Sequence, residues 1–209
     1  MSQPAPTPDA MPDPGRATAP ATIAIRLARV ADAEAIRTIY NHEVMHTTAT
    51  FDLVPRSLAD QEAWITARSG AFAAIVAVET NGAAEEVVGF GSLSPYKERA
   101  AYRTSVEDSV YVRRDRGGRG IGRLIVEALL DIAAQSGFHT VFARIEASGE
   151  ASRALHARCG FQLVGIERET GRKFHRWLDV AIMQCLLHER DAARAEREAA
   201  AGQATGSAG

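Results

Sequence analysis

Strand-like and helix-like spacings of apolar residues alternate along the chain, and their order predicts the fold class. A short strand is expected at residues 23–27. It is followed by an amphipathic helix whose apolar residues recur every three or four positions, at Ile36, Ile39, Tyr40 and Val44. Asp32 precedes this helix and is expected to cap it. Ser57 and Asp60 form a variant of the capping box, which predicts a second helix running through Ile65.

The remaining pattern adds two helices and completes the sheet. Apolar runs at 73–79 and 87–93, joined over Asn81-Gly82, predict a hairpin. A strand at 105–112 leads through an arginine- and glycine-rich loop into a strongly amphipathic helix at 121–135. A strand, a short helix and a closing pair of strands are expected at 139–146, 151–159, 161–168 and 177–187. The order β-α-α-β-β-β-α-β-α-β-β predicts an α/β protein with a mixed central sheet in three layers.

The two ends of the chain differ from its middle. Residues 1–21 are rich in Pro, Ala, Asp and Thr and lack the apolar run of a signal peptide, so we expect a disordered tail there. Residues 188–209 are rich in Ala, Arg and Glu and carry no apolar stripe, so a helix there would have nothing to bury. The folded domain is therefore expected at residues 22–187, with no apolar segment long enough to span a bilayer.

Composition narrows the classes of function. Of the 209 residues 46% are apolar, and 24 Lys+Arg against 26 Asp+Glu leave a net charge of −2. This balance argues against a nucleic-acid coat or a polybasic membrane anchor as function. Cys159 and Cys185 are too few for a disulfide scaffold, so a reducing cytoplasm is the expected location. No metal is expected either, because four of the histidines are not spaced like metal ligands with acidic partners. They are His42, His46, His139 and His175.

Residues 113–123 carry five arginines and four glycines between a strand and a long helix. Glycines let the backbone turn closely, and the first N–H groups of the helix supply positive potential, so this order suits a diphosphate. A P-loop is excluded because no Gly-Lys-Ser/Thr ends the loop. A Rossmann unit is excluded because the loop follows several strands. A glycine-rich turn with solvated arginines and a nucleic-acid contact remain open alternatives.

This loop and several further blocks carry a family resemblance. Val112, the run Gly118-Arg119-Gly120-Ile121-Gly122, the helix after it and residues 151–161 resemble the GCN5-related N-acetyltransferase (GNAT) superfamily. More narrowly, four blocks resemble the phosphinothricin and methionine sulfoximine acetyltransferase branch of this superfamily. They are the blocks at 40–44, 96–102, 106–112 and 173–179. The resemblance covers almost all of residues 22–187. It implies the GNAT fold and an acetyl-CoA-dependent N-acetyltransferase.

The resemblance also implies a substrate and a cofactor site. Acetyl would pass directly to the α-amine of phosphinothricin, methionine sulfoximine or methionine sulfone. The backbone of Val110, Tyr111 and Val112 would bind the pantetheine arm of acetyl-CoA. The diphosphate would be bound by Gly118, Arg119, Gly120, Ile121, Gly122 and Arg123, and Arg158 would add a phosphate contact. Two positions depart from the family pattern, because Gly117 replaces a usual Gln or Arg and Gly149 replaces a frequent Asn. Both departures imply weaker cofactor contacts. Relatives in this branch are commonly homodimers, which leaves a homodimer open here.

Glu107 is the predicted general base. It stands three residues before the proposed cofactor strand, where a carboxylate can take a proton from an incoming ammonium directly or through water. The alternative is a strand glutamate that faces solvent. His156 stands where many relatives carry a tyrosine that protonates the leaving thiolate, and this role competes with simple packing beneath the helix. The substrate itself is expected to contact Lys97, Arg99, Glu107, Asp108 and Ser109, with the two cations on its carboxylate.

Several rival interpretations stay open. Phe51, Tyr102 and Trp177 could form pocket walls or only pack. Cys159 could act as a covalent nucleophile, but no partnered base accompanies it in the sequence. The enzyme could instead acetylate a polyamine, an aminoglycoside or a protein N-terminus, or the chain could be a degenerate acyl-CoA-binding module.

Overall fold

The computed structural model describes the backbone of residues 22–206 and the side chains through residue 200, so the predicted N-terminal tail lies outside the described residues. The helices and strands are β1 (Thr22–Leu27), α1 (Ala33–His46), α2 (Leu58–Thr66), β2 (Ile75–Asn81), β3 (Ala84–Pro95), β4 (Ser105–Val112), α3 (Ile121–Gln135), β5 (Thr140–Glu146), α4 (Glu150–Arg158), β6 (Gln162–Lys173), β7 (Arg176–Leu186) and α5 (Leu187–Gly206). This order confirms the predicted β-α-α-β-β-β-α-β-α-β-β core.

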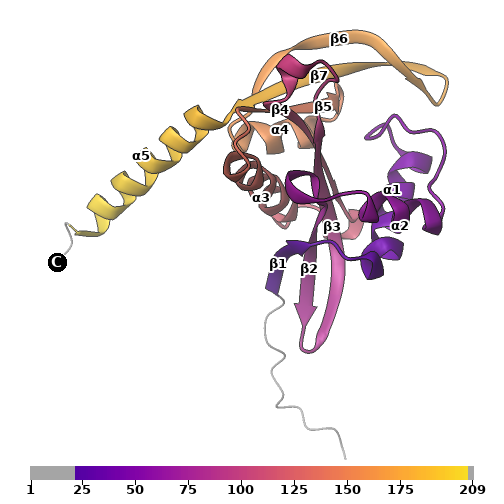
Figure 1. Cartoon of the computed structure of the whole chain (residues 1–209), viewed down its shortest axis with the longest axis horizontal. Coiled ribbons are helices and arrows are strands. Elements are labelled where there is room, and N and C mark those ends of the chain that lie inside the picture. Colours follow the sequence, from indigo (N-terminus) through magenta and orange to yellow (C-terminus); the bar gives the residue numbers. More distant parts are fainter. Residues whose placement is uncertain (1–21, 207–209) are drawn as a thin grey trace, which may run out of the picture.

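The strands form one mixed sheet between two helical layers (Figure 1). Its order within the described residues is β1-β2-β3-β4-β5-β7-β6. Alternate residues of β2 show the layering, because Ile75 and Ala77 pack in the cluster with α3 whereas Val76 and Val78 pack in the cluster with α1 and α2. The predicted three-layer α/β architecture is confirmed.

The sheet divides in its middle, between β4 and β5. These strands run parallel and pair only over Ser105–Glu107 and Thr140–Phe142. Beyond those residues β4 continues to pair with β3, and β5 continues to pair with β7. The later parts of β4 and β5 therefore leave an opening between them at the centre of the sheet.

The predicted N-terminal cap is present at α2 and absent at α1. The capping box at α2 is confirmed, because the Asp60 amide donates to Ser57 Oγ at 3.1 Å and the Ser57 amide donates to the Asp60 carboxylate at 3.2 Å. The expectation that Asp32 caps α1 is wrong. Its carboxylate accepts hydrogen bonds from the Arg26 guanidinium at 2.7 and 2.9 Å and from the Arg29 amide at 2.7 Å. A charged donor is the stronger partner, so Asp32 joins β1 to the turn before α1.

The β2–β3 hairpin turns one residue later than predicted. Asn81 pairs with Ala84, so the connecting residues are Gly82 and Ala83.

The helix α5 begins at the buried Leu187 and then runs away from the domain (Figure 1). Arg190 donates to Asp131 of α3 at 2.5 Å and fixes the first turn of α5. No helix within residues 22–206 is both long and apolar enough to cross a membrane.

Candidate active site

A cavity of about 650 Å³ occupies the opening between β4 and β5. Its walls come from the diverging parts of these two strands, from the segment 47–51 after α1, from the loop after β4 and from α4. A concave site of this size, lined by both polar and apolar groups, is typical of small-molecule sites. We refer to it below as the central cavity.

The central cavity gathers most of the predicted catalytic and strand residues. Those that line it are Glu107, Asp108, Ser109, Val110, Tyr111, Val112 and His156, together with Gly117, Gly149 and Phe51. Other predicted residues do not line it, namely Lys97, Arg99, Tyr102, Trp177, Arg158 and the run Gly118–Arg123. Sequence reasoning missed several charged lining residues: Glu43, Arg144 and Glu146.

Glu107 has the properties of a general base near neutral pH. Burial raises its pKa from 4.5 to about 7, while the charge of Arg144 acts in the opposite direction. The nearby acidic groups Asp108 and Glu167 add to the rise. A carboxyl group whose pKa lies near the working pH can accept a proton and release it again, which is the requirement for general base catalysis.

Asp108 lies on the opposite face of β4 from Glu107, because successive strand residues alternate. There it pairs with His156 of α4, and both side chains are almost fully buried, at 3% and 5% exposure. The distance from His156 Nε2 to Asp108 Oδ2 is 3.1 Å. The sequence predicts that Asp108 contacts substrate together with Glu107; Asp108 lines the central cavity, and its carboxylate also has a partner on the α4 side.

The imidazole of His156 is held from both of its nitrogens. Nδ1 lies 2.8 Å from the carbonyl oxygen of Ser152, which can only accept, so Nδ1 carries a proton. Burial acts to lower the pKa of His156, but Asp108 and the Ser152 carbonyl outweigh it and the pKa is raised. We therefore assign His156 as an imidazolium that donates to Asp108 and to Ser152. The burial of His156 agrees with packing beneath the helix, and protonation of a leaving thiolate stays a prediction of the sequence.

The loop after β4 leads directly into the first turn of α3. Gly118 and Gly120 have φ of +74° and +79°, and added Cβ atoms there would meet no atom within 4 Å, so the loop is open on its outer side. Ile121 is buried in the core. Gly122 lies close to α4, since a Cβ there would lie 2.9 Å from Leu155 Cδ2 and the leucine side chain would have to move. Any ligand contact made by Ile121 and Gly122 must therefore use their backbone N–H groups.

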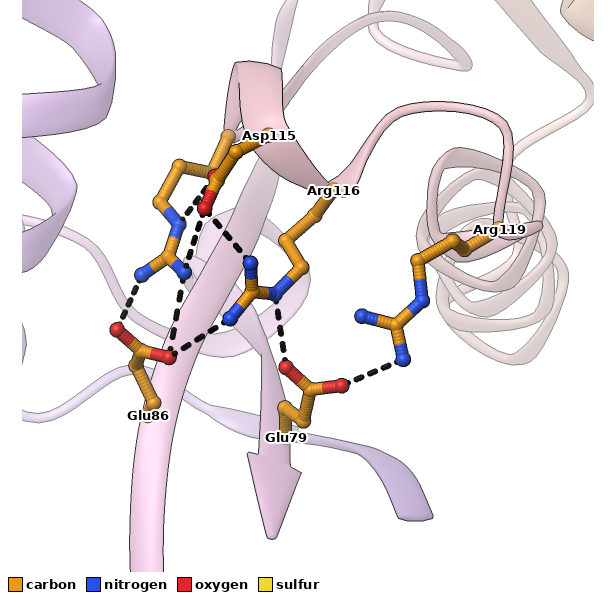
Figure 2. A network of polar contacts seen from close by, with 6 residues as sticks. Glu79, Glu86, Asp115, Arg116 and Arg119 are labelled. Atoms are coloured by element: carbon orange, nitrogen blue, oxygen red, sulfur yellow. Dashed lines mark hydrogen bonds and ion pairs between the residues drawn. The ribbon is translucent and has the colours of Figure 1, made fainter. Parts of the chain in front are cut away.

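All five arginines of this loop have carboxylate partners, although Arg114, Arg119 and Arg123 remain largely exposed to solvent. Glu79 of β2 accepts hydrogen bonds from Arg116 Nε at 2.8 Å and from Arg119 Nη2 at 2.5 Å. Figure 2 shows how Glu79 lies between these two arginines. The remaining pairs join Arg113 and Arg116 to Glu86 and Asp115, Arg114 to Glu43, and Arg123 to Glu127. Glu79 is 3% exposed, so the loop is fixed to the β2–β3 hairpin through a buried carboxylate.

The segment 47–51, which forms one wall of the central cavity, is positioned by β6. The buried Lys173 donates from Nζ to the carbonyl oxygen of Thr50 at 2.7 Å. Gly171 leaves room for the Phe51 ring, because a Cβ there would lie 2.2 Å from Phe51 Cε2. The sequence singles out the block 173–179, but it does not predict the contact of Lys173 with Thr50, which lies more than a hundred positions away.

Tyr102, one of the expected pocket-wall residues, packs against Tyr96, with ring centroids 5.7 Å apart.

Covalent catalysis by cysteine has no support in the structure. Cys159 and Cys185 are both buried and free, and burial raises the pKa of each thiol to about 11. At neutral pH both are protonated and weakly nucleophilic. Within the described part of the chain, no group of three or more His, Cys, Asp or Glu side chains is arranged to hold a metal ion.

The structure combines a mixed sheet divided at a parallel strand pair, a glycine loop that opens α3, and a carboxyl group of pKa about 7 beside the division. This combination fits an acyltransferase of the N-acetyltransferase class. Residues 25–182 match the acetyltransferase (GNAT) domain. The chain belongs to this family, which confirms the resemblance seen in the sequence.

Named relatives share long stretches of this sequence. A phosphinothricin N-acetyltransferase of Streptomyces coelicolor is 41% identical over 150 residues, covering 72% of this chain and 88% of the relative. An L-methionine sulfoximine/L-methionine sulfone acetyltransferase of Pseudomonas paraeruginosa is 41% identical over 164 residues, covering 78% and 94%.

Solved structures share the fold. A putative acetyltransferase of Salmonella typhimurium, determined with its cofactor acetyl-CoA, has a TM-score of 0.74 at 37% identity and covers 79% of this chain and 94% of its own. A phosphinothricin acetyltransferase of Sinorhizobium meliloti in complex with acetyl-CoA has a TM-score of 0.73 at 34% identity and covers 79% and 88%.

Proposed function

We propose that this enzyme transfers acetyl from acetyl-CoA to the α-amine of a small amino-acid analogue such as phosphinothricin, methionine sulfoximine or methionine sulfone. The named activities of its relatives support this substrate class. The observation that carries the proposal is Glu107, half-buried in the central cavity with a pKa of about 7. Its carboxylate would take the proton from the substrate ammonium and leave a neutral, nucleophilic amine.

The residues present fit acetyl-CoA. The side of Val110–Val112 that faces the cavity pairs with no residue of β5 and can accept an extended ligand arm as an added strand. The open turn at Gly118 and Gly120 and the N-terminus of α3 suit a diphosphate. Acetyl-CoA would supply the activated acetyl thioester. Direct contacts from Arg119, Arg123 and Arg158 remain predictions of the sequence.

His156 would act by positioning one wall of the central cavity. Both of its nitrogens already have partners, in Asp108 and Ser152, so the Asp108–His156 pair would hold α4 against β4. Loss of its proton would leave the buried Asp108 carboxylate without a cationic partner, so this positioning role is favoured over proton donation to the leaving thiolate. The proton that the attacking amine loses would end on the thiolate, and CoA would leave as the free thiol. A homodimer and a cytoplasmic location remain proposals, the latter supported by the two free cysteines.

An acceptor panel tests the proposed substrate class. Purified full-length protein would be incubated with acetyl-CoA and one acceptor at a time, and released CoA thiol measured. The amino-acid analogues are expected to give kcat/KM values at least about tenfold above those of a polyamine, an aminoglycoside and a peptide N-terminus. Turnover restricted to the cationic amines would contradict the proposal and favour the alternative amine class.

Glu79 is expected to matter for acetyl-CoA binding although it lies outside the central cavity. Glu79→Gln removes the charge that holds Arg116 and Arg119, so the loop loses its buried anchor. We expect the Kd for acetyl-CoA, measured by calorimetry, to rise about tenfold or more. Glu85→Gln, at a more exposed glutamate of the same hairpin, is the matched control and should leave the Kd unchanged. Equal Kd values for the two variants would show that the anchor does not shape the cofactor site.

A further inference from the structure

We propose that Arg144 of β5, oriented by Glu167 of β6, binds the carboxylate of the acceptor amino acid beside Glu107. This inference rests on the proposed function and deepens it by naming the contact that selects amino acids. It departs from the sequence prediction, which placed this role on Lys97 and Arg99.

The strand register places Arg144 next to the proposed base. Glu107 of β4 pairs with Phe142 of β5, so both side chains are on the same face of the sheet. Arg144 follows Phe142 by two positions and is on that face as well. It lines the central cavity, whereas Lys97 and Arg99 do not. Its charge lies close enough to Glu107 to act against the rise in that group's pKa.

Glu167 fixes the orientation of the Arg144 guanidinium. Arg144 Nη2 donates to Glu167 Oε2 at 2.6 Å and Nη1 donates to Oε1 at 3.3 Å. The arginine side chain remains 34% exposed despite this pair. A guanidinium has five N–H donors in a planar fork, so the two bonds to Glu167 leave donors for a second oxyanion. An arginine that is already ordered by one carboxylate loses less freedom on binding another.

Glu107 and Arg144 lie on the two sides of the opening between β4 and β5. Glu107 is the last residue of β4 that pairs with β5, Arg144 lies two positions beyond its partner Phe142, and both side chains line the central cavity, so one small ligand in the cavity can contact both. The ammonium of the acceptor would then face Glu107 and its carboxylate would face Arg144, as the opposite charges require. A polyamine offers no group for Arg144 and would place a second cation against it.

The other charged groups around this corner fit the same assignment. The charges that act on the pKa of Glu107 are those of Arg144 from β5, Asp108 from the opposite face of its own strand and Glu167 from β6. Asp108 is engaged with His156, and Glu167 is engaged with Arg144. Of these charged neighbours, Arg144 is the cation and thus the group that an acceptor carboxylate would meet.

The test compares Arg144→Ala and Arg144→Lys with wild type on two acceptors, methionine sulfone and the matching amine that lacks the carboxylate. Arg144→Ala should raise the KM for methionine sulfone by about 10- to 100-fold, the loss of a charge-assisted hydrogen-bond pair. The KM for the amine without the carboxylate should not rise, and Arg144→Lys should recover part of the loss. Arg168→Ala is the matched control, because Arg168 is an exposed arginine adjacent to Glu167 on the opposite face of β6.

A second readout follows from charge alone. Removing Arg144 takes away the group that lowers the pKa of Glu107, so the acidic limb of the kcat/KM profile should shift to higher pH. Equal rises in KM for both acceptors, or a selective rise only in Arg99→Ala, would overturn the assignment. If the wild type acetylates amino acids and Arg144→Ala has the same KM for methionine sulfone as the wild type, only the role of Arg144 is overturned. Failure of wild type to acetylate any amino acid overturns the proposed function as well.

Discussion

Glu107→Gln is expected to lower kcat/KM at pH 7 by about 10²- to 10⁴-fold, the usual contribution of a positioned general base. In the wild type, the rate should rise with pH and level off above the Glu107 pKa of about 7. The variant should lack this limb and should recover partly at high pH, where more of the acceptor amine is already neutral. Initial rates from pH 5.5 to 10 would measure both. Full activity of Glu107→Gln at pH 7 would exclude Glu107 as base.

The same substitution should stabilise the fold, which separates lost chemistry from lost structure. Because the pKa of Glu107 is raised in the folded state, ionising it costs stability as pH rises from its ordinary value of 4.5 to about 7. Above pH 7 the glutamine variant avoids this cost and should be more stable by about 1–3 kcal/mol. Thermal melts at pH 5 and pH 8 should show a gain in Tm only at the higher pH. A lower Tm at pH 8 would mean that Glu107 is a structural residue.

His156→Gln is expected to cost about 3–5 kcal/mol of unfolding free energy, because it leaves the buried Asp108 carboxylate without its cation. The raised pKa of His156 gives this effect a pH dependence. The stabilisation is fully present below the ordinary pKa of 6.5 and declines as pH rises through the raised value of the folded state. The difference between wild type and variant should therefore shrink at alkaline pH.

Urea unfolding between pH 6 and 9 would measure this effect. His188→Gln, at an exposed histidine of α5, is the matched control and should change stability little. The double variant Asp108→Asn/His156→Gln should be more stable than His156→Gln alone, because it removes the unpaired charge. A cost in His156→Gln no greater than in the control, or the same cost at every pH, would contradict the assigned imidazolium.

Much of the fold was predictable because it depends on local periodicity. The strand 105–112 and the helix 121–135 were predicted with the bounds that the structure has. Asp32 was misassigned because its stronger partner, Arg26, lies on the preceding strand and not in the helix. A capping pattern identifies an available carboxylate, but not the competing cation that folding brings to it.

The site shows the same division between local and long-range information. Glu107 and His156 were predicted from motifs, and the structure brings both to one cavity. The loop arginines were recognised, but their partners Glu79 and Glu43 lie far away in the sequence and became visible only with the strand order. Arg144 belongs to no motif, and only the register of β4 with β5 places it beside Glu107.

Catalytic transfer of acetyl to an α-amine can be followed through both of its products at once. Purified protein would be mixed with acetyl-CoA and methionine sulfone, and N-acetyl product and free CoA quantified together over time by mass spectrometry. We expect many turnovers, equal amounts of the two products and no acetylated protein intermediate. If calorimetry shows that the protein binds acetyl-CoA but no N-acetylated product forms from this acceptor or from the other amino-acid analogues, the protein is not an amino-acid N-acetyltransferase and is instead an acyl-CoA-binding module.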